Sequence, residues 1–308
     1  MTHMKRLPLF CLCAAIFVPD SLTAQELFMK NGSRFAVKNP RRQGDMLFLS
    51  VVGPGGVGSA EVGYKLGDIE KADMPVPPAL NSARSLLFLG KPAEAAKAIK
   101  PAYDEISPLR GIPGSNWDEV ALMYAAALQA GGQIPEAVAI LDQFEASTPK
   151  GSPAREIARL RLAGMKNPQD FQAVTGIADQ AIAAKLGAGV EAEANTVAGD
   201  VLLANRSFDE ALTRFLRVVI FCPGDRWLGA RSLLGAAKAM AALDEKKNCV
   251  RTLREISSSF PGSPQAEAAA KMMAAGGDGY ALLATELDND EAAAKKRLID
   301  ASAEQPSN

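Results

Sequence analysis

The chain has 308 residues, of which 48% are hydrophobic and 22% are charged. This composition is typical of a folded globular protein and is too apolar for a disordered one. Its 34 lysines and arginines nearly balance its 35 aspartates and glutamates, which gives a formal net charge of −1. The balance argues against a protein that binds nucleic acid or an anionic membrane by bulk charge.

The first residues of the chain have the pattern of a cleavable secretory signal. Lys5 and Arg6 precede an apolar run over residues 7–18, and the small residue Ala24 ends the segment. The run is too short to cross a bilayer, which needs about 20 apolar residues. We expect a signal peptide over residues 1–24 and an exported protein, periplasmic or extracellular, without stable membrane insertion after cleavage. The alternative is an uncleaved anchor.

Loss of the signal would also limit the chemistry of the protein. It removes His3, the single histidine of the sequence, and leaves Cys222 and Cys249 as the cysteines of the mature chain. Ser-His-Asp and Cys-His catalysis and a cysteine-only zinc site are therefore excluded. We expect no catalytic residue, no metal site and no cofactor. A hydrolase that depends on carboxylates needs no histidine and stays an alternative.

Residues 25–75 predict a small β module. Short apolar runs separated by turn residues are typical of antiparallel strands, and Asn31-Gly32 is typical of a tight hairpin turn. The expected strands are 26–30, 33–38, 46–52, 61–66 and 69–74. Residues 41–45 are expected to be a polar break, and residues 53–58 a glycine loop. The pattern resembles small Sm-like or SH3-like barrels, and the prolines after residue 74 mark the boundary.

From residue 76 to residue 275 the pattern becomes helical and repeats. An alanine is followed twelve residues later by a proline in three places, with cysteine replacing alanine in the last. The pairs are Ala137 with Pro149, Ala211 with Pro223, and Cys249 with Pro261. Ala95 marks an earlier copy, and Gly199 lies at helical spacing before Ala211 within a unit of 34 residues over 192–225.

These positions resemble the tetratricopeptide repeat (TPR) family, whose unit is also about 34 residues long. The resemblance implies a mainly α protein, in which about five helix pairs stack into a solenoid behind the β module. In that family a small residue lets the two helices of a pair approach, and a proline ends the second helix. The repeat-defining positions are Ala95, Ala137, Pro149, Gly199, Ala211, Pro223, Cys249 and Pro261.

Some segments depart from the repeat pattern. Pro101 lies inside the second helix of the first copy, where a proline should kink or stop it. Residues 104–116 are expected to be an inserted loop, and residues 152–187 a degenerate helix pair. Residues 276–308 are expected to form a C-terminal helical extension and tail.

The resemblance also implies a concave face, lined by the first helix of each pair, that binds protein or peptide segments. Residues three or four apart share a helix face, which gives the candidate binding residues Leu122, Gln129, Glu193, Thr196, Asp200, Leu203, Arg231, Leu234 and Lys238. Their charges are mixed, which does not favour a clamp for an acidic peptide terminus. Trp117 and Trp227 open first helices, where we expect them to pack between repeats. The alternative is that they stack on a ligand.

We therefore expect an exported scaffold or adaptor of the cell envelope. It is similar to bacterial repeat proteins of the Tol-Pal-associated or outer-membrane-assembly kind, which share endings such as Ser258 to Pro264. The alternative is a structural envelope component that only self-associates, and both allow a homo-oligomer.

The mature cysteines are expected to stay unpaired. Cys222 ends one second helix and Cys249 lies in the first turn of the next. The first helix between them runs over about 25 Å at ~1.5 Å per residue. A disulfide needs Cα atoms within about 7 Å of each other, so we expect free thiols.

Overall fold

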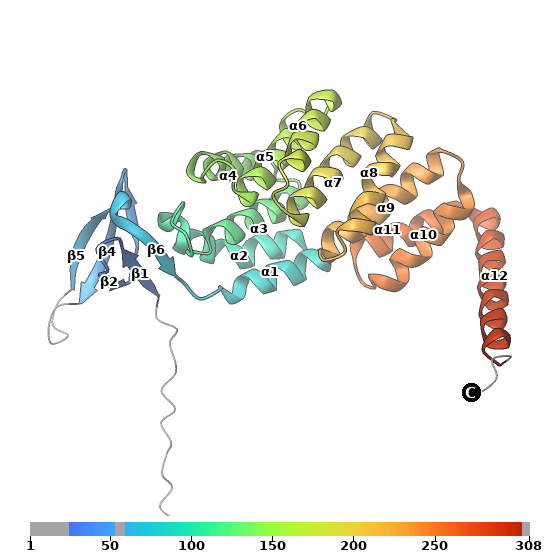
Figure 1. Ribbon diagram of the computed structural model, residues 1–308, viewed down its shortest axis with the longest axis horizontal. Helices are drawn as coiled ribbons and strands as arrows, with labels where there is room; N and C mark the ends of the chain where they lie inside the picture. Colours follow the sequence, from blue (N-terminus) through green and yellow to red (C-terminus); the bar gives the residue numbers. More distant parts are fainter. Residues whose placement is uncertain (1–24, 53–58, 304–308) are drawn as a thin grey trace, which may run out of the picture.

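The computed structural model describes residues 25–52 and 59–303. Within these residues the chain forms six strands and twelve α-helices. The β module lies at one end of the molecule and the last helix at the other, with the remaining helices stacked between them (Figure 1). The predicted fold class, a TPR-like α-solenoid preceded by a small antiparallel β module, is confirmed. The expected signal peptide and the glycine loop lie outside the described residues.

The β module consists of two small antiparallel sheets. One sheet has the order β2-β1-β6 and the other has the order β3-β4-β5. The strands are β1 (Glu26–Met29), β2 (Arg34–Ala36), β3 (Arg41–Gln43), β4 (Met46–Val52), β5 (Ser59–Lys65) and β6 (Ile69–Asp73). The polar break expected at 41–45 was wrong, because β3 occupies part of it. As an edge strand, β3 keeps the side chains of Arg41 and Gln43 in solvent, so it carries no apolar pattern.

The core of the β module is completed by the solenoid. Leu27, Leu47 and Leu49 are fully buried together with Leu109 and Ile112, which come from the segment between α2 and α3. A sheet module of this size has little core of its own. The inserted segment therefore acts as the part of the solenoid on which the β module docks.

Backbone contacts fix this docking. The amide of Ala72 in β6 donates to the carbonyl of Pro113 at 2.8 Å. Asn116 Nδ2 donates to the carbonyl of Met74 at 2.8 Å. Gly114 has a φ of +77°, and a Cβ added there would lie 2.1 Å from the carbonyl oxygen of Ala72. Only glycine allows the two backbones to come this close.

The solenoid is built of helix pairs, in which odd-numbered helices are the first helices and even-numbered helices the second helices. Their bounds are α1 (Pro78–Phe88), α2 (Pro92–Ile106), α3 (Trp117–Ala130), α4 (Ile134–Ser147), α5 (Pro153–Lys166), α6 (Phe171–Ala183), α7 (Ala188–Ala204), α8 (Phe208–Phe221), α9 (Arg226–Ala242), α10 (Lys246–Ser259), α11 (Pro264–Ala275) and α12 (Gly277–Ala303). The segment 152–187, expected to be a degenerate helix pair, holds α5 and α6.

The spacing found in the sequence has a clear place in these pairs. The small residues in the first turns of second helices are fully buried, and they are Ala95, Ala137, Ala211 and Cys249. Pro149, Pro223 and Pro261 each follow the last residue of α4, α8 or α10 by two positions. A proline there cannot continue the helix because it lacks the backbone N–H.

Two first helices approach a second helix closely through glycine. The Phe215 ring of α8 is fully buried between Gly199 of α7 and Gly235 of α9. A Cβ on Gly199 would lie 2.7 Å from the ring, and one on Gly235 would lie 2.5 Å from it. The ring therefore occupies the space that side chains at these positions would fill.

Pro101 was expected to kink or stop its helix, and it does not stop it. Helix α2 continues through Pro101 to Ile106. The proline is exposed, whereas Ala102 and Ile106 beyond it are buried in the core. Packing of the residues after the proline outweighs the loss of one backbone hydrogen bond.

The first helix of the solenoid contacts helices that come much later in the chain. The Arg226 guanidinium at the start of α9 lies 5.1 Å from the Phe88 ring of α1 and 5.8 Å from the Phe260 ring after α10. Pro264 of α11 contacts Gly90, where an added Cβ would lie 2.7 Å from the proline ring. In Figure 1 the end of α1 accordingly lies beside α9 and α11. We call these contacts the closure; they leave a small pocket where an open groove was expected.

Candidate functional site

First helices converge on a pocket with a volume of about 290 Å³, which we call the central pocket. Helices α3, α5, α7, α9 and α11 all contribute side chains to it. The lining residues are Ala126, Gln129, Ala130, Arg161, Glu193, Trp227, Leu228, Arg231 and Gln265. Side chains far apart in the sequence meet here because the closure brings α9 and α11 towards α3.

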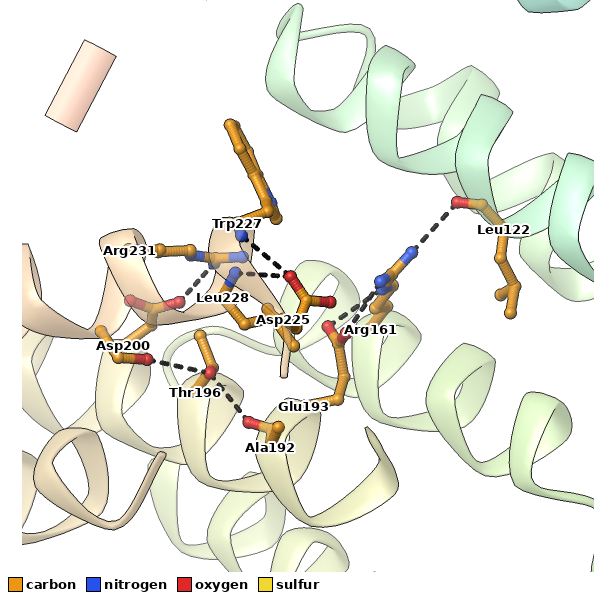
Figure 2. A network of polar contacts seen from close by, with 11 residues as sticks. Leu122, Arg161, Ala192, Glu193, Thr196, Asp200, Asp225, Trp227, Leu228 and Arg231 are labelled. Carbon is orange, nitrogen blue, oxygen red and sulfur yellow. Dashed lines mark hydrogen bonds and ion pairs between the residues drawn. The ribbon is translucent and has the colours of Figure 1, made fainter. Parts of the chain in front are cut away.

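A buried ion pair forms one wall of the central pocket. Arg161 donates to both carboxylate oxygens of Glu193, from Nε at 2.9 Å and from Nη2 at 2.7 Å. Its Nη1 donates to the carbonyl of Leu122 at 3.0 Å. Only 3% of the Glu193 side chain is exposed. The pair joins α5, α7 and α3, as Figure 2 shows.

The pair keeps Glu193 charged. Burial opposes the charged form, but the charge and the hydrogen bonds of Arg161 outweigh it, so the pKa of Glu193 lies below its ordinary value. A carboxyl held in this way is an anion at neutral pH and is a poor proton donor. Glu193 therefore does not suit the role of proton donor in a carboxylate-dependent hydrolase.

A second ion pair joins α7 to α9. Arg231 pairs with Asp200, and the negative charge of Asp225 lies near Arg161. Asp225 caps α9, because its Oδ1 accepts from the amides of Trp227 at 2.9 Å and Leu228 at 3.0 Å. The charges of the pocket wall therefore alternate and largely neutralise one another.

Gln265 and Trp227 are two further side chains that line the central pocket. Gln265 is only 8% exposed, and among the described residues its Oε1 has no hydrogen-bond partner. Trp227 is half-buried, and its ring packs on the hydrophobic cores around it while it also lines the pocket. A buried acceptor without a partner is costly. The side chain that carries it lines the pocket together with Trp227.

The structure brings together only part of the predicted binding face. Gln129, Glu193 and Arg231 line the central pocket, and Leu122 contributes its carbonyl. Asp200 lies behind Arg231 as its ion partner. Lys238 is exposed but does not line the pocket.

The placement of Thr196 on an accessible face was wrong. Thr196 is fully buried; its hydroxyl donates to the carbonyl of Ala192 at 2.8 Å and lies 3.2 Å from that of Ser232. Helix α7 is enclosed by α5, α6, α8 and α9, which leaves little of it in solvent. Leu203 and Leu234 are likewise half-buried in hydrophobic clusters with side chains of α8, so they pack instead of lining a groove.

Sequence reasoning missed Arg161 and Gln265. Both lie on first helices, α5 and α11, to which no binding face was assigned. Arg161 carried a signal, since it lies between Leu160 and Leu162 in a helix that buries both leucines. A charge inside an apolar helical pattern indicates a buried partner.

Among the residues that the structure describes, no group of three or more histidine, cysteine, aspartate and glutamate side chains could hold a metal ion. In the same residues no helix is long and apolar enough to cross a membrane. Cys222 and Cys249 are buried and free, as expected. Burial raises the pKa of both thiols.

Comparisons with known proteins add little to this geometry. No family model matches the chain, and no curated protein matches it. A solved structure of TPR-like repeats of a kinesin light chain from Podosopora anserina shares 20% identity, covers 58% of this chain and 92% of its own, and has a TM-score of 0.37. A variant of the same protein matches with the same identity and coverage and a TM-score of 0.38. The fold described above therefore rests on the helix geometry of this chain.

Proposed function

We propose that this protein is a noncovalent scaffold or adaptor of the cell envelope that binds a segment of a partner protein in the central pocket. The export pattern of residues 1–24 supports the compartment. The stacked helix pairs support a binding role, because repeat solenoids expose extended surfaces of first helices.

The unpaired acceptor of Gln265 carries the proposal. Buried polar groups are nearly always hydrogen-bonded, and this buried oxygen belongs to a side chain that lines the pocket. Rotation of the Gln265 amide would turn this oxygen into the pocket, where an N–H or O–H donor of a partner would satisfy it. The half-buried ring of Trp227 and the amide of Gln129 offer further contacts beside it.

The size and charge of the pocket restrict the partner segment. A volume of about 290 Å³ lies at the lower end of the range of ~300–1,000 Å³ for small-molecule sites. It accommodates one or two side chains but not a helix. The ion pairs of Arg161 and Arg231 already neutralise the wall, so the segment that fits best is polar and uncharged, such as a loop tip.

Photo-crosslinking in the envelope tests the proposal. A photoreactive amino acid at Gln129 in the full exported chain should form an adduct with a second, different protein. The same amino acid at Ala139, which is exposed on second helix α4, serves as the control and should not form this adduct.

A pair of matched substitutions then assigns the adduct to the pocket. Ala130→Trp, at the end of α3, should fill the pocket and abolish the adduct. Ala204→Trp, at the equivalent end of α7, lies outside the lining and should leave it unchanged. Adducts of the same protein from both probe positions would contradict binding in the pocket. Adducts with a second copy alone would favour the self-associating structural component.

A further inference from the structure

A second pocket lies where the β module meets the solenoid. Its volume is about 140 Å³, and we call it the junction pocket. Arg42, Leu66 and Ile69 line it from the β module, and Arg110, Ile112 and Ser147 line it from the solenoid. Neither the TPR pattern nor the proposed binding of a partner segment accounts for the two arginines.

Both arginines of the junction pocket bond to main-chain carbonyls. Arg42 donates from Nη1 to the carbonyl of Arg110 at 2.7 Å and from Nε to the carbonyl of Gly44 at 3.3 Å. Arg110 donates from Nη1 to the carbonyl of Ser107 at 3.3 Å. A guanidinium has five N–H donors, so several donors on each side chain remain for another acceptor.

Arg42 and Arg110 differ from the other half-buried arginines of the described residues in having no carboxylate partner. Among the described residues, the other half-buried arginines all pair with a carboxylate within 4 Å. These pairs are Arg155 with Glu145, Arg159 with Glu156, Arg161 with Glu193, Arg214 with Asp179, Arg231 with Asp200, and Arg254 with Asp288. Arg42 and Arg110 are half-buried and form no such pair in the same part of the chain.

The positive charges of Arg42 and Arg110 are not fully compensated by a nearby carboxylate. Burial and the positive charge of Arg110 lower the pKa of Arg42, and the carboxylate of Asp45 offsets this only in part. Two like charges held near each other away from bulk water repel. An anion bound between them would relieve the repulsion and accept the remaining donors.

We propose that the junction pocket binds a phosphate-class dianion, clamped between the guanidinium groups of Arg42 and Arg110. Two fixed positive charges match a dianion better than they match a carboxylate, which carries a single negative charge. Planar guanidinium groups also fit phosphate oxygens with paired hydrogen bonds. Since Arg42 belongs to the β module and Arg110 to the segment between α2 and α3, the bound anion would bridge the two and fix the module on the solenoid.

Calorimetric titration of the full mature chain with inorganic phosphate tests the proposal. The wild-type protein should bind phosphate, and Arg42→Gln and Arg110→Gln should each weaken the affinity by about tenfold to a hundredfold. Arg110→Gln preserves the main-chain carbonyl that Arg42 bonds to, so it removes the charge without removing that link between the modules. Arg217→Gln, an exposed position on α8, is the matched control and should bind like wild type.

A second measurement identifies the source of the phosphate. The same proteins are sedimented with phosphatidylcholine vesicles that contain or lack phosphatidic acid. Binding to the phosphatidic acid vesicles that depends on both arginines would place a lipid headgroup in the pocket. Binding of inorganic phosphate without vesicle binding would assign the site to a free phosphate.

Two results would overturn the proposal. One is that the wild-type protein binds neither inorganic phosphate nor the phosphatidic acid vesicles. The other is that Arg110→Gln, with a circular dichroism spectrum like that of wild type, binds phosphate as tightly as Arg217→Gln. Neither result bears on partner binding in the central pocket, whose test uses other residues.

Discussion

Replacing Gly235 with alanine should destabilise the solenoid, although alanine is the better helix former. A Cβ at this position would lie 2.5, 2.6 and 2.7 Å from three atoms of the Phe215 ring. The ring is fully buried and also lies close to Gly199, so it has little room to move.

The magnitude follows from two opposing terms. Overpacking a core costs about 1–3 kcal/mol, and a contact with a rigid ring wedged between two helices belongs at the upper end. Replacing glycine by alanine within a helix stabilises the helix by about 1 kcal/mol. We therefore expect Gly235→Ala to lower the free energy of unfolding by about 2 kcal/mol.

Gly229 in the same helix provides the matched control. A Cβ there would meet no described atom within 4 Å, so Gly229→Ala should gain up to about 1 kcal/mol. Urea denaturation followed by far-ultraviolet circular dichroism measures both variants. Placing Gly235→Ala in a Phe215→Leu background should reduce its penalty, because the smaller side chain can move. The packing argument fails if Gly235→Ala is as stable as Gly229→Ala, or if its penalty is unchanged in that background.

The remaining predictions concern the pocket wall, the module junction and the thiols. Glu193→Gln leaves Arg161 buried without its counter-ion and should cost about 3–5 kcal/mol in urea denaturation. Because the folded pKa of Glu193 is lowered from 4.5, the wild-type pair should contribute fully above pH 4.5 and lose its contribution as the pH falls through the lower folded value. Gly114→Ala should push the β module off the carbonyl of Ala72, and limited proteolysis should then release the module faster. Cys249→Ala should be nearly neutral, whereas Cys249→Leu should cost about 1–3 kcal/mol, and thiol titration of the denatured, unreduced mature chain should find both cysteines free.

Controls for these predictions exist in the same chain. Asp104 pairs with Lys100 on the surface of α2, so Asp104→Asn should cost less than about 1 kcal/mol. A loss equal to that of Glu193→Gln would refute the role of burial. Gly32 has a φ of +85° and open space around it, so Gly32→Ala carries the backbone strain without the clash and should release the module more slowly than Gly114→Ala. A disulfide in the monomer would contradict the positions of Cys222 and Cys249.

Local features of the fold could be predicted from the sequence, because the interactions that produce them are local. The spacing of Ala211 and Pro223 reports on one helix and on the neighbour that follows directly in the chain. The same holds for Cys249, which faces the helix before its own and is buried as expected. Helix pairs formed by adjacent segments therefore appear in the sequence as a repeat.

Features set by distant contacts could not be predicted in this way. The burial of Thr196 depends on how far α9 rotates over α7, which no single repeat determines. The closure joins Phe88 to Arg226, and its residues carry no periodic signal. Strand β3 was missed for another reason, since an edge strand can be polar on both faces and still be held by its ladder of hydrogen bonds.

The closure determines what kind of scaffold the solenoid can be. Its contacts at Arg226 are exposed cation–π interactions, each worth about 0.5–1 kcal/mol. Half-buried Trp227 adds packing against the hydrophobic core formed by α1 to α5. Contacts of this strength hold α1 against α9 and α11 but are weak beside the buried cores within the helix pairs. Under the proposed function, a short side chain would enter the central pocket without disturbing these contacts, whereas a helix would have to break them first. The closure would then select the partner segment by its size.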